Sequence, residues 1–442
     1  MTATPESEGQ AGRGGAGGTR HTRGTGGRVA WAVFDWANSA FPTIIITFVF
    51  ATYFTQAVAV DPVSGASQWG VAISLSALAI ALTSPLLGAL ADAGGRRKPW
   101  LGGLTLLMTA ATAGLWFIEP EPRFALAALL LVAVANFAFE VGIVFYNAML
   151  LPITPPGRLG RWSGWAWGLG YAGGLACLVI ALFGLVQAEP APFGLDDHAA
   201  GPVRATALLV AAWVAVFAVP LFIWTPDGTA RIRQPGRIIG RAFRELVETV
   251  RQARRYSAIG RFLIARLVYI DGLNTIFAFG GIYAAGTFGL SLEQVLLFGI
   301  VINVTAGIGA AAMAWLDDRL GPKRVIVVSL AAMIGLGLPL LLTTDITMFW
   351  ILGTALGLFF GPVQSASRSA MARLAPVGMQ GEMFGLFALS GKITAFVGPL
   401  LFAWLSVMFD SQRAGMAGAV ALVAVGLILL LPQRLPGGRD PG

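Results

Sequence analysis

Twelve long apolar stretches, separated by short polar or Pro- and Gly-rich breaks, dominate the pattern of hydrophobic positions along this 442-residue chain. A helix that spans a membrane needs about 20 predominantly apolar residues, and each stretch has about that length. Residues 225–257 form the one long connection and divide the stretches into two sets of six, within 29–224 and 258–432. We predict spans at 29–60, 68–91, 99–118, 124–151, 160–187, 204–224, 258–287, 293–316, 323–342, 346–374, 382–409 and 414–432.

The composition agrees with this pattern. Hydrophobic residues make up 56% of the chain and charged residues only 12%, and the mean hydropathy is +0.74, which excludes an ordinary soluble protein. We expect an all-α membrane protein with twelve transmembrane helices. Residues 1–28 are rich in Gly, Thr and Arg and have no apolar signal-peptide core, so we expect a disordered cytoplasmic tail there and a second tail at 433–442.

The basic residues are distributed unevenly between the two sides of the predicted spans. Most of the 30 Lys and Arg residues lie at the two ends of the chain and in every second connection. This is the asymmetry of the positive-inside rule, and it predicts that both termini are cytoplasmic. The pI of about 10.2 therefore reports membrane topology and not a nucleic-acid partner. The exceptions are Arg123, Arg204 and Arg413 in the other loops, and Arg266 and Lys392 inside spans.

Motifs for metal, redox or enzymatic chemistry are missing from the sequence. The single Cys177 cannot form an intramolecular disulfide, and His21 and His198 cannot make a usual zinc site without other ligands. The segment from Gly385 to Lys392 fails the spacing of a phosphate-binding loop, so we do not expect ATP to drive the protein. We expect no cofactor, no metal and no enzymatic activity.

Five charged residues inside the spans are the first candidates for function. A charge in lipid costs roughly 2.5 to 3.5 kcal/mol on insertion scales, so these side chains should face protein or a water-filled cavity. Each acid either couples the cycle to protons or substrate, or forms a permanent ion pair. The two cations either bind a substrate carboxylate or neutralise the acids, and one of them, Arg266, could instead snorkel. The five residues are Asp35, Glu140, Arg266, Asp271 and Lys392.

Neutral polar residues accompany these charges at helical spacing. Asp35, Asn38 and Ser39 fall at i, i+3 and i+4, and therefore on one helix face. Glu140 shares a predicted face with Asn147. Asn38, Ser39, Asn147, Asn274 and Gln364 are the expected neutral hydrogen-bonding groups of the site.

Three pairs of stretches indicate an internal duplication. Residues 270–277 repeat the Asp, Asn, hydroxyl and Phe pattern of residues 34–41. The basic turn at 88–98 has an echo at 316–324, and the pair Gly160 and Gly164 is matched by Gly381 and Gly385. We interpret the glycines of span 5 as helix-packing positions in preference to substrate contacts.

The turn Gly88-Ala89-Leu90-Ala91-Asp92-Ala93-Gly94-Gly95-Arg96-Arg97 resembles the signature loop of the major facilitator superfamily, G-x-L-x-D-x-x-G-R-[KR]. The resemblance implies two six-helix bundles around a central cavity, with these charges in a cytoplasmic gate. The alternative is charge that only sets topology. Pro322 replaces the first arginine in the second copy, which predicts a weaker latch there. The expected gate residues are Asp92, Arg96, Arg97, Asp318 and Lys323.

Further motifs narrow the resemblance. Asp35-Trp36-Ala37-Asn38-Ser39-Ala40-Phe41, Phe145-Tyr146-Asn147-Ala148 with Pro152, Ser367-Arg368-Ser369 and Ser390-Gly391-Lys392 are similar to motifs of the vacuole-effluxer (autophagy-related) family. That family implies transport, with amino-acid efflux as the first expectation. Ile153 stands where the family often has an acid, which removes one cytoplasmic ion pair.

These observations predict a monomeric secondary transporter in the plasma membrane, moving a small polar solute with coupling to protons. Two alternatives remain: an uncoupled facilitator, and a receptor or regulator that has the same fold but does not transport. In the long connection, an amphipathic helix on the inner leaflet is expected, with a solvated linker as the alternative. Its apolar face would carry Ile239, Phe243, Leu246, Val247 and Val250.

Overall fold

The computed structural model describes residues 17–155, 157–196, 199–229, 256–435 and 437, so the expected amphipathic helix lies outside the described residues. Among the described residues, twelve helices are long and apolar enough to cross a membrane, and each overlaps one predicted span. The predicted twelve-helix membrane fold is confirmed. The membrane-crossing stretches of these helices differ from the expected bounds by at most six residues, the largest difference being the start of the second stretch at Pro62 instead of 68.

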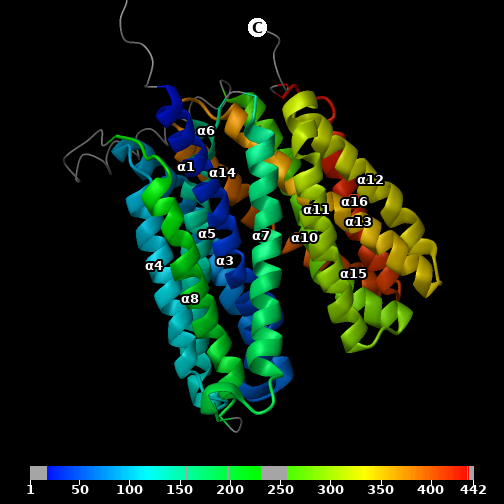
Figure 1. The fold of residues 1–442 in the computed structure, drawn as a ribbon. Helices are drawn as coiled ribbons and strands as arrows, with labels where there is room; N and C mark the ends of the chain where they lie inside the picture. The colour runs from blue at the N-terminus through cyan, green and yellow to red at the C-terminus, as the bar shows by residue number, and fades with distance from the viewer. Residues whose placement is uncertain (1–16, 156, 197–198, 230–255, 436, 438–442) are drawn as a thin grey trace, which may run out of the picture.

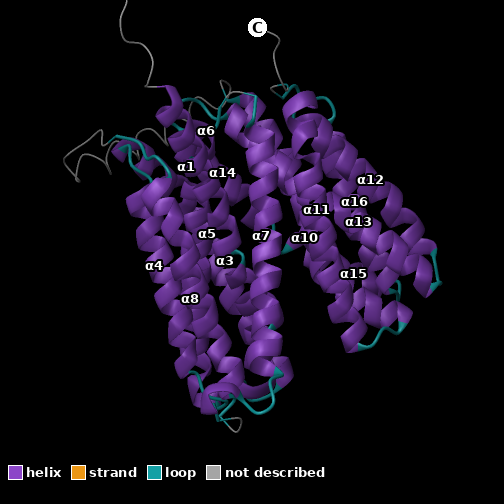
Figure 2. Ribbon diagram, viewed as in Figure 1, coloured by secondary structure: helices purple, strands orange, loops and turns teal. Residues whose placement is uncertain are grey.

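Two helical bundles form the molecule (Figures 1 and 2). The N-terminal bundle consists of α1 (Gly17–Asn38), a π-helix (Phe41–Phe48), α2 (Phe50–Tyr53), a second π-helix (Phe54–Val58), α3 (Pro62–Gly94), α4 (Lys98–Gly114), α5 (Ala125–Ala148), α6 (Leu150–Ile153), α7 (Leu159–Ala181), a third π-helix (Leu182–Val186) and α8 (Gly201–Trp224). The C-terminal bundle consists of α10 (Ser257–Phe288), α11 (Leu292–Leu320), α12 (Pro322–Leu342), α13 (Ile346–Leu374), α14 (Gln380–Lys392), α15 (Val397–Met408) and α16 (Gln412–Leu430).

Local sequence explains where several helices begin and end. Asp61 caps α3, where its carboxylate accepts from the backbone N–H groups of Val63 and Ser64, and Pro62 occupies the first helical position. Gly95 then ends the same helix with a φ of 78°, a conformation that favours glycine. Ser291 and Gln294 form a capping box at the start of α11.

Two helices differ from the expectation. α1 begins at Gly17, so the last part of the predicted disordered tail at 1–28 is helical. The predicted span 382–409 is divided into α14 and α15 by a turn at residues 393–396. Pro399 lies in the first turn of the helix that restarts at Val397, where its missing N–H costs no helical hydrogen bond.

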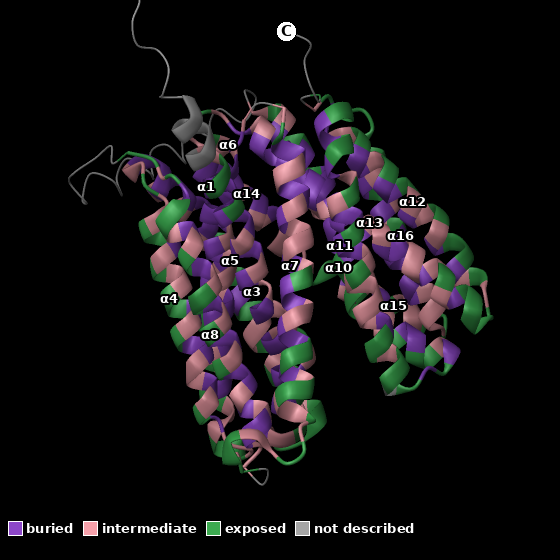
Figure 3. Cartoon of the chain, in the orientation of Figure 1, coloured by how far each residue is buried: buried purple, intermediate pink, exposed green. Residues whose placement is uncertain are grey.

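The apolar core shows how the bundles are joined. One cluster contains residues of both bundles, including Tyr146 and Leu150 from the first and Met371 and Phe384 from the second. Two further clusters each lie within a single bundle. One surrounds Phe50 in the N-terminal bundle, and the other surrounds Phe349 in the C-terminal bundle. The bundles thus share a core near the end where α1 begins and α16 ends, here called the termini end, and separate toward the opposite, far end (Figures 1 and 3).

Candidate functional site

A cavity of about 310 Å³ lies between the two bundles. Its walls come from α1, α5 and α7 on one side and from α10, α13 and α14 on the other. All but one of the side chains predicted for the site line it: Asp35, Asn38, Ser39, Glu140, Asn147, Arg266, Asn274, Gln364 and Lys392. The structure therefore brings together polar residues that are far apart in the sequence and come from both bundles.

Asp35 of α1 forms a buried ion pair with Arg368 of α13. The distance from Arg368 Nη1 to Asp35 Oδ2 is 3.0 Å, and the two residues are 3% and 2% exposed. Arg368 also donates through Nε to Ser163 Oγ at 2.9 Å and through Nη2 to the Ser163 carbonyl at 2.6 Å. Because the pair connects the two bundles, it acts on their relative position as well as on the charge of the cavity.

Glu140 of α5 and Lys392 of α14 form a second ion pair between the bundles. The distance from Lys392 Nζ to Glu140 Oε1 is 2.6 Å. Their side chains are 23% and 27% exposed, so this pair faces the cavity and can exchange partners with a bound solute at a lower cost than the buried pair.

Arg266 of α10 has no acidic partner within 4.0 Å in the described part of the chain. Its Nη1 donates to the Phe387 carbonyl at 2.8 Å and to Ser390 Oγ at 2.7 Å, while its Nε has no partner there. The guanidinium lies 3.5 Å from the centroid of the Phe387 ring. Gly391 leaves the space for it, since a Cβ atom at this glycine would lie 3.2 Å from Nη1. The structure thus holds a buried cation at the cavity wall instead of letting it snorkel.

Asp271 is the one predicted site residue outside the cavity lining. Its Oδ2 accepts from the Gly398 N–H at 3.0 Å, at the start of α15, and its Oδ1 has no partner among the described residues. The residue is 3% exposed. Its neighbours Ile270 and Asn274 line the cavity, whereas the Asp271 side chain points toward the helix that follows the break.

The first predicted gate copy lies at the termini end. Asp92 pairs with Arg97 of the same bundle at 2.8 Å and accepts from the Glu382 N–H of α14 at 2.9 Å. Arg97 also donates to Gln380 Oε1 at 3.0 Å. Asp92 therefore holds the positive N-terminal end of a helix from the opposite bundle. Arg96 is exposed and takes no part in these contacts.

The second gate copy makes an equivalent contact with an added ion pair. Asp318 of α11 accepts from the Gly160 N–H of α7 at 2.8 Å and pairs with Arg161 at 2.7 Å. Arg161 belongs to the opposite bundle and has the role toward Asp318 that Arg97 has toward Asp92 in the first copy. Arg373 reinforces it through the neighbouring Asp317 at 3.1 Å.

Lys323 does not belong to the gate. Its Nζ donates to the carbonyl oxygens of Leu431 and Gln433, just beyond the end of α16. Lys98 has the same role in the first bundle, where it donates to the Phe222 carbonyl near the end of α8. Both lysines satisfy carbonyl groups that a helix C-terminus leaves without partners, and so stabilise the helix dipole.

A sequence model of the family described as "Vacuole effluxer Atg22 like" matches residues 59–154 and 158–440. The chain belongs to this family. The "Uncharacterized MFS-type transporter YxiO" of Bacillus subtilis (strain 168) is 29% identical over 406 residues, which are 91% of the Atg22-like chain and 93% of YxiO. "Autophagy-related protein 22" of Cryptococcus neoformans var. neoformans serotype D (strain JEC21 / ATCC MYA-565) is 24% identical over 296 residues, and the chain spans about half of its length.

Solved structures of major facilitator superfamily transporters share the fold of the Atg22-like chain. The transporter FucP in the outward conformation superposes with a TM-score of 0.73 at 13% identity, over 93% of this chain and 98% of FucP. The human organic anion transporter MFSD10 gives a TM-score of 0.71 at 15% identity, over 92% and 99% of the two chains. At these identities the likeness shows the fold alone. Family and fold are those of transporters, and the chain is a multi-pass membrane protein of this superfamily.

Two seams of small residues bring the bundles of the Atg22-like chain together. In the first, a Cβ atom at Gly88 of α3 would collide with the Gly381 carbonyl of α14. In the second, a Cβ atom at Gly164 of α7 would lie 2.6 Å from Ala314 Cβ of α11. Close backbone approach at such positions is typical of membrane helices. Gly160, Gly164 and Gly168 of span 5 thus pack against α11 of the other bundle.

Gly88→Leu is expected to force the bundles apart at the termini end, because the added side chain has no space in the first seam. Spin labels on Arg158→Cys and Val377→Cys, two exposed positions in opposite bundles, would report the separation in a Cys177→Ser background. We expect a longer distance population in Gly88→Leu. Gly103→Leu is the control, since a Cβ atom there would meet nothing within 4 Å. An unchanged distance in Gly88→Leu would contradict the seam's role.

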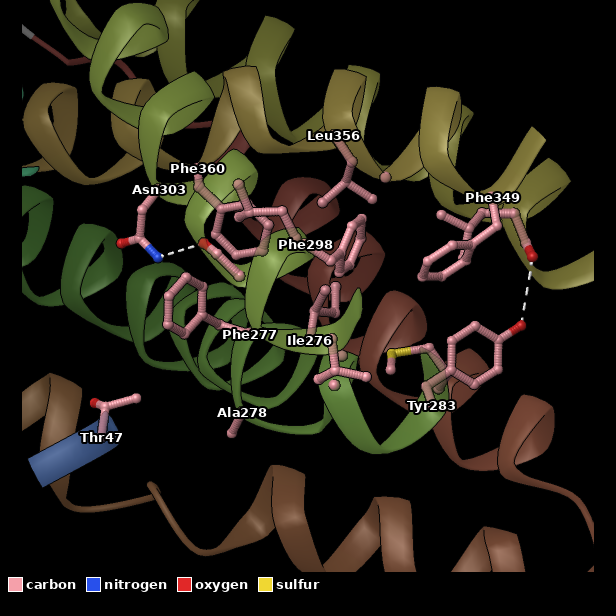
Figure 4. Close-up of a pocket in the computed structure, with 18 of the residues that line it drawn as sticks. Thr47, Ile276, Phe277, Ala278, Tyr283, Phe298, Asn303, Phe349, Leu356 and Phe360 are labelled. Atoms are coloured by element: carbon pink, nitrogen blue, oxygen red, sulfur yellow. Dashed lines mark hydrogen bonds between the residues drawn. The ribbon is translucent and has the colours of Figure 1, made fainter. Parts of the chain in front are cut away.

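Two further cavities continue the site within the described residues. The first, of about 270 Å³, shares Ser39, Asn274 and Gln364 with the central cavity. The second is an apolar chamber of about 450 Å³ that lies mainly in the C-terminal bundle, where the rings of Phe277, Phe298 and Phe360 gather (Figure 4). Phe277 and Phe360 line both of these cavities, so charged, polar and apolar spaces adjoin one another.

Two arginines at the cavity and the gate, Arg368 and Arg161, were not predicted from the sequence as site residues. Both lie near the predicted cytoplasmic ends of their spans, where basic residues are expected for topology alone. For Arg368 the signal was present in the chain: it lies several residues inside the predicted span 346–374 and between two serines. A charge at such a depth needs a partner as much as Asp35 does.

Proposed function

We propose that the protein is a secondary active transporter of a small polar solute that carries a carboxylate, with an amino acid as the first candidate. The observation that carries the proposal is Arg266: a buried guanidinium at the wall of the central cavity, with no acidic partner among the described residues. A guanidinium binds a carboxylate through charge-assisted hydrogen bonds, which are about twice as strong as neutral ones.

The charge of the cavity supports the same substrate class. Its ionisable lining residues are two acids and three basic residues, within the described chain. Asp35 and Glu140 are each neutralised by a partner, which leaves Arg266 as the excess positive charge. Beside it, Lys392 can add a second contact to the carboxylate of the solute once its pair with Glu140 opens.

The two seams and the two gate copies support alternating access as the mechanism. Contacts between the bundles close the termini end, and rocking about the central cavity would break them and close the far end. With both termini in the cytoplasm of a plasma-membrane protein, as the charge asymmetry favours, this structure corresponds to the outward-open state. We propose that the transporter works as a monomer, with the cavity entirely within one chain.

For proton coupling we propose Asp271 as the first candidate among the three acids inside the spans. Asp35 and Glu140 have basic partners, whereas Asp271 has only the Gly398 N–H in the described structure. A proton would replace no existing cation there, and α15 begins at the same point. Its protonation would therefore act on the divided helix pair α14 and α15, and Lys392 of α14 lines the cavity.

Transport into proteoliposomes that contain a pH dye tests the proposal. We expect that one or more amino acids or small organic acids move proton equivalents with wild type, and that Asp271→Asn loses the proton signal but keeps solute exchange. Asp410→Asn, an exposed acid at the far end, is the control. Proton movement that persists in Asp271→Asn would exclude this acid from coupling. A wild type that moves none of these solutes would argue for the receptor alternative.

An uncoupled facilitator is the second candidate, and one observation favours it. Asp271 does not line the central cavity, and the acids that do line it are already paired. In that case solute would equilibrate without proton movement in wild type, and Asp271→Asn would change the stability of the chain without changing the ion dependence of transport.

A further inference from the structure

Arg368 comes from the C-terminal bundle, yet most of its side-chain partners belong to the N-terminal bundle. Its guanidinium donates to Asp35, Ser163 and Asn147, the last at 3.4 Å. Three aromatic rings surround the same group at 5.1 to 5.7 Å from their centroids: Trp31, Tyr146 and Trp167. The N-terminal bundle thus contains a complete pocket into which a side chain of the other bundle is inserted.

The composition of this pocket is that of a binding site for an organic cation. A carboxylate, a carbonyl oxygen and an amide oxygen supply hydrogen-bond acceptors, and aromatic faces attract a cation through their quadrupoles. Asp35, Asn147 and Trp167 also line the central cavity, so a solute in the cavity can reach the pocket. In this structure Arg368 occupies it.

Opening of the termini end has to withdraw Arg368. The residue moves with α13, whereas its partners move with α1, α5 and α7. An aspartate left among aromatic rings without a cation is costly, because a buried charge needs compensation. We propose that the vacated pocket binds the ammonium group of the transported solute, so that Arg368 and the solute occupy it in turn.

Mutually exclusive occupancy links binding to the conformational cycle. A cation that binds only when Arg368 is absent favours the state in which the termini end is open, by its differential affinity for the two states. Return of Arg368 then expels the solute when that end closes. This inference rests on the proposed function and adds to it the recognition of an ammonium group by Asp35 and the three rings.

Thermal unfolding of the purified full chain tests the pocket with methylammonium chloride as the probe and sodium chloride at equal ionic strength as the reference. Two variants free the pocket in different ways: Arg368→Ala removes the occupant, and Gly88→Leu opens the termini end with Arg368 intact. Gly103→Leu is the control for the second. We expect methylammonium to raise the melting temperature saturably in both variants, with an apparent affinity at least tenfold higher than in Gly103→Leu. Adding Asp35→Asn to either variant should abolish the effect.

Stabilisation in Arg368→Ala alone would overturn alternate occupancy, because it would show that opening does not vacate the pocket. No stabilisation in either variant would overturn the cation site itself. The site would also be overturned if lowering the pH stabilised the variants in an Asp35-dependent way while methylammonium did not. Gly164→Leu gives a second way to open the bundles if Gly88→Leu fails to fold. The measurement needs no transport, so its failure and a failure of the proposed transport activity are distinguishable.

Discussion

Arg368→Gln is expected to lower the free energy of unfolding by about 3 to 5 kcal/mol, the usual cost of leaving one member of a buried ion pair without its partner. The substitution leaves the carboxylate of Asp35 among aromatic rings and removes the charge-assisted hydrogen bonds to Ser163 as well. Denaturant titration of the purified chain in detergent micelles measures the change.

The double variant Asp35→Asn/Arg368→Gln separates a charge effect from a packing effect. Neutralising both partners removes the uncompensated charge, so the double variant should be more stable than Arg368→Gln alone. Lys392→Gln is the matched control, because its pair with Glu140 is partly exposed and its loss should cost at most about 1 kcal/mol. Equal losses in Arg368→Gln and Lys392→Gln would contradict the distinction between the two pairs.

The spans could be predicted from the sequence because the membrane imposes a length and a composition on each of them. The start of α12 follows from Pro322, which fits the first turn of a helix. The end of α8 at Trp224 follows from the change from apolar to polar residues. The division of the eleventh span could not be found from hydropathy, since residues 393–396 are as apolar as a continuous helix would be. Pro399 is a weak signal, since Pro85, Pro220, Pro339 and Pro362 lie inside helices that continue.

Much of the site was also predictable, because a charge inside a span has few alternatives to a cavity or a partner. Asp35, Glu140 and Lys392 confirm that rule by their geometry. The identity of the partners was not predictable, since Lys392 pairs with a residue 252 positions away and Arg368 with one 333 positions away. Contacts at such separation depend on how the bundles meet, which helical periodicity does not encode.

The gate shows the limit of arguing from one repeat to the other. The motif in the first half predicted Asp318 correctly as a bundle-bridging acid, but its cation comes from Arg161 on a different helix. Lys323 instead follows Lys98, and both cap the last helix of their own bundle. The two halves keep the positions of their helix ends but use different side chains to bind the polar groups at those ends.

Arg266→Gln is expected to raise the KM for the transported solute by about 10- to 100-fold, with a smaller effect on the maximal rate. A hydrogen bond to a charged group contributes about 1.5 to 3 kcal/mol, and each 1.4 kcal/mol corresponds to a factor of ten. Glutamine keeps hydrogen-bonding capacity toward Ser390 and the Phe387 carbonyl, so the position of α14 should be retained while the excess positive charge of the cavity is lost.

Initial rates in proteoliposomes across a range of solute concentrations give the KM of each variant. Arg261→Gln is the matched control, because Arg261 lies on α10 less than two turns earlier and is exposed. Its KM should equal that of wild type. If Arg266→Gln lowers only the maximal rate and leaves KM unchanged, the guanidinium acts on the movement of α14 through Phe387 and Ser390, and the carboxylate of the solute is bound elsewhere in the cavity.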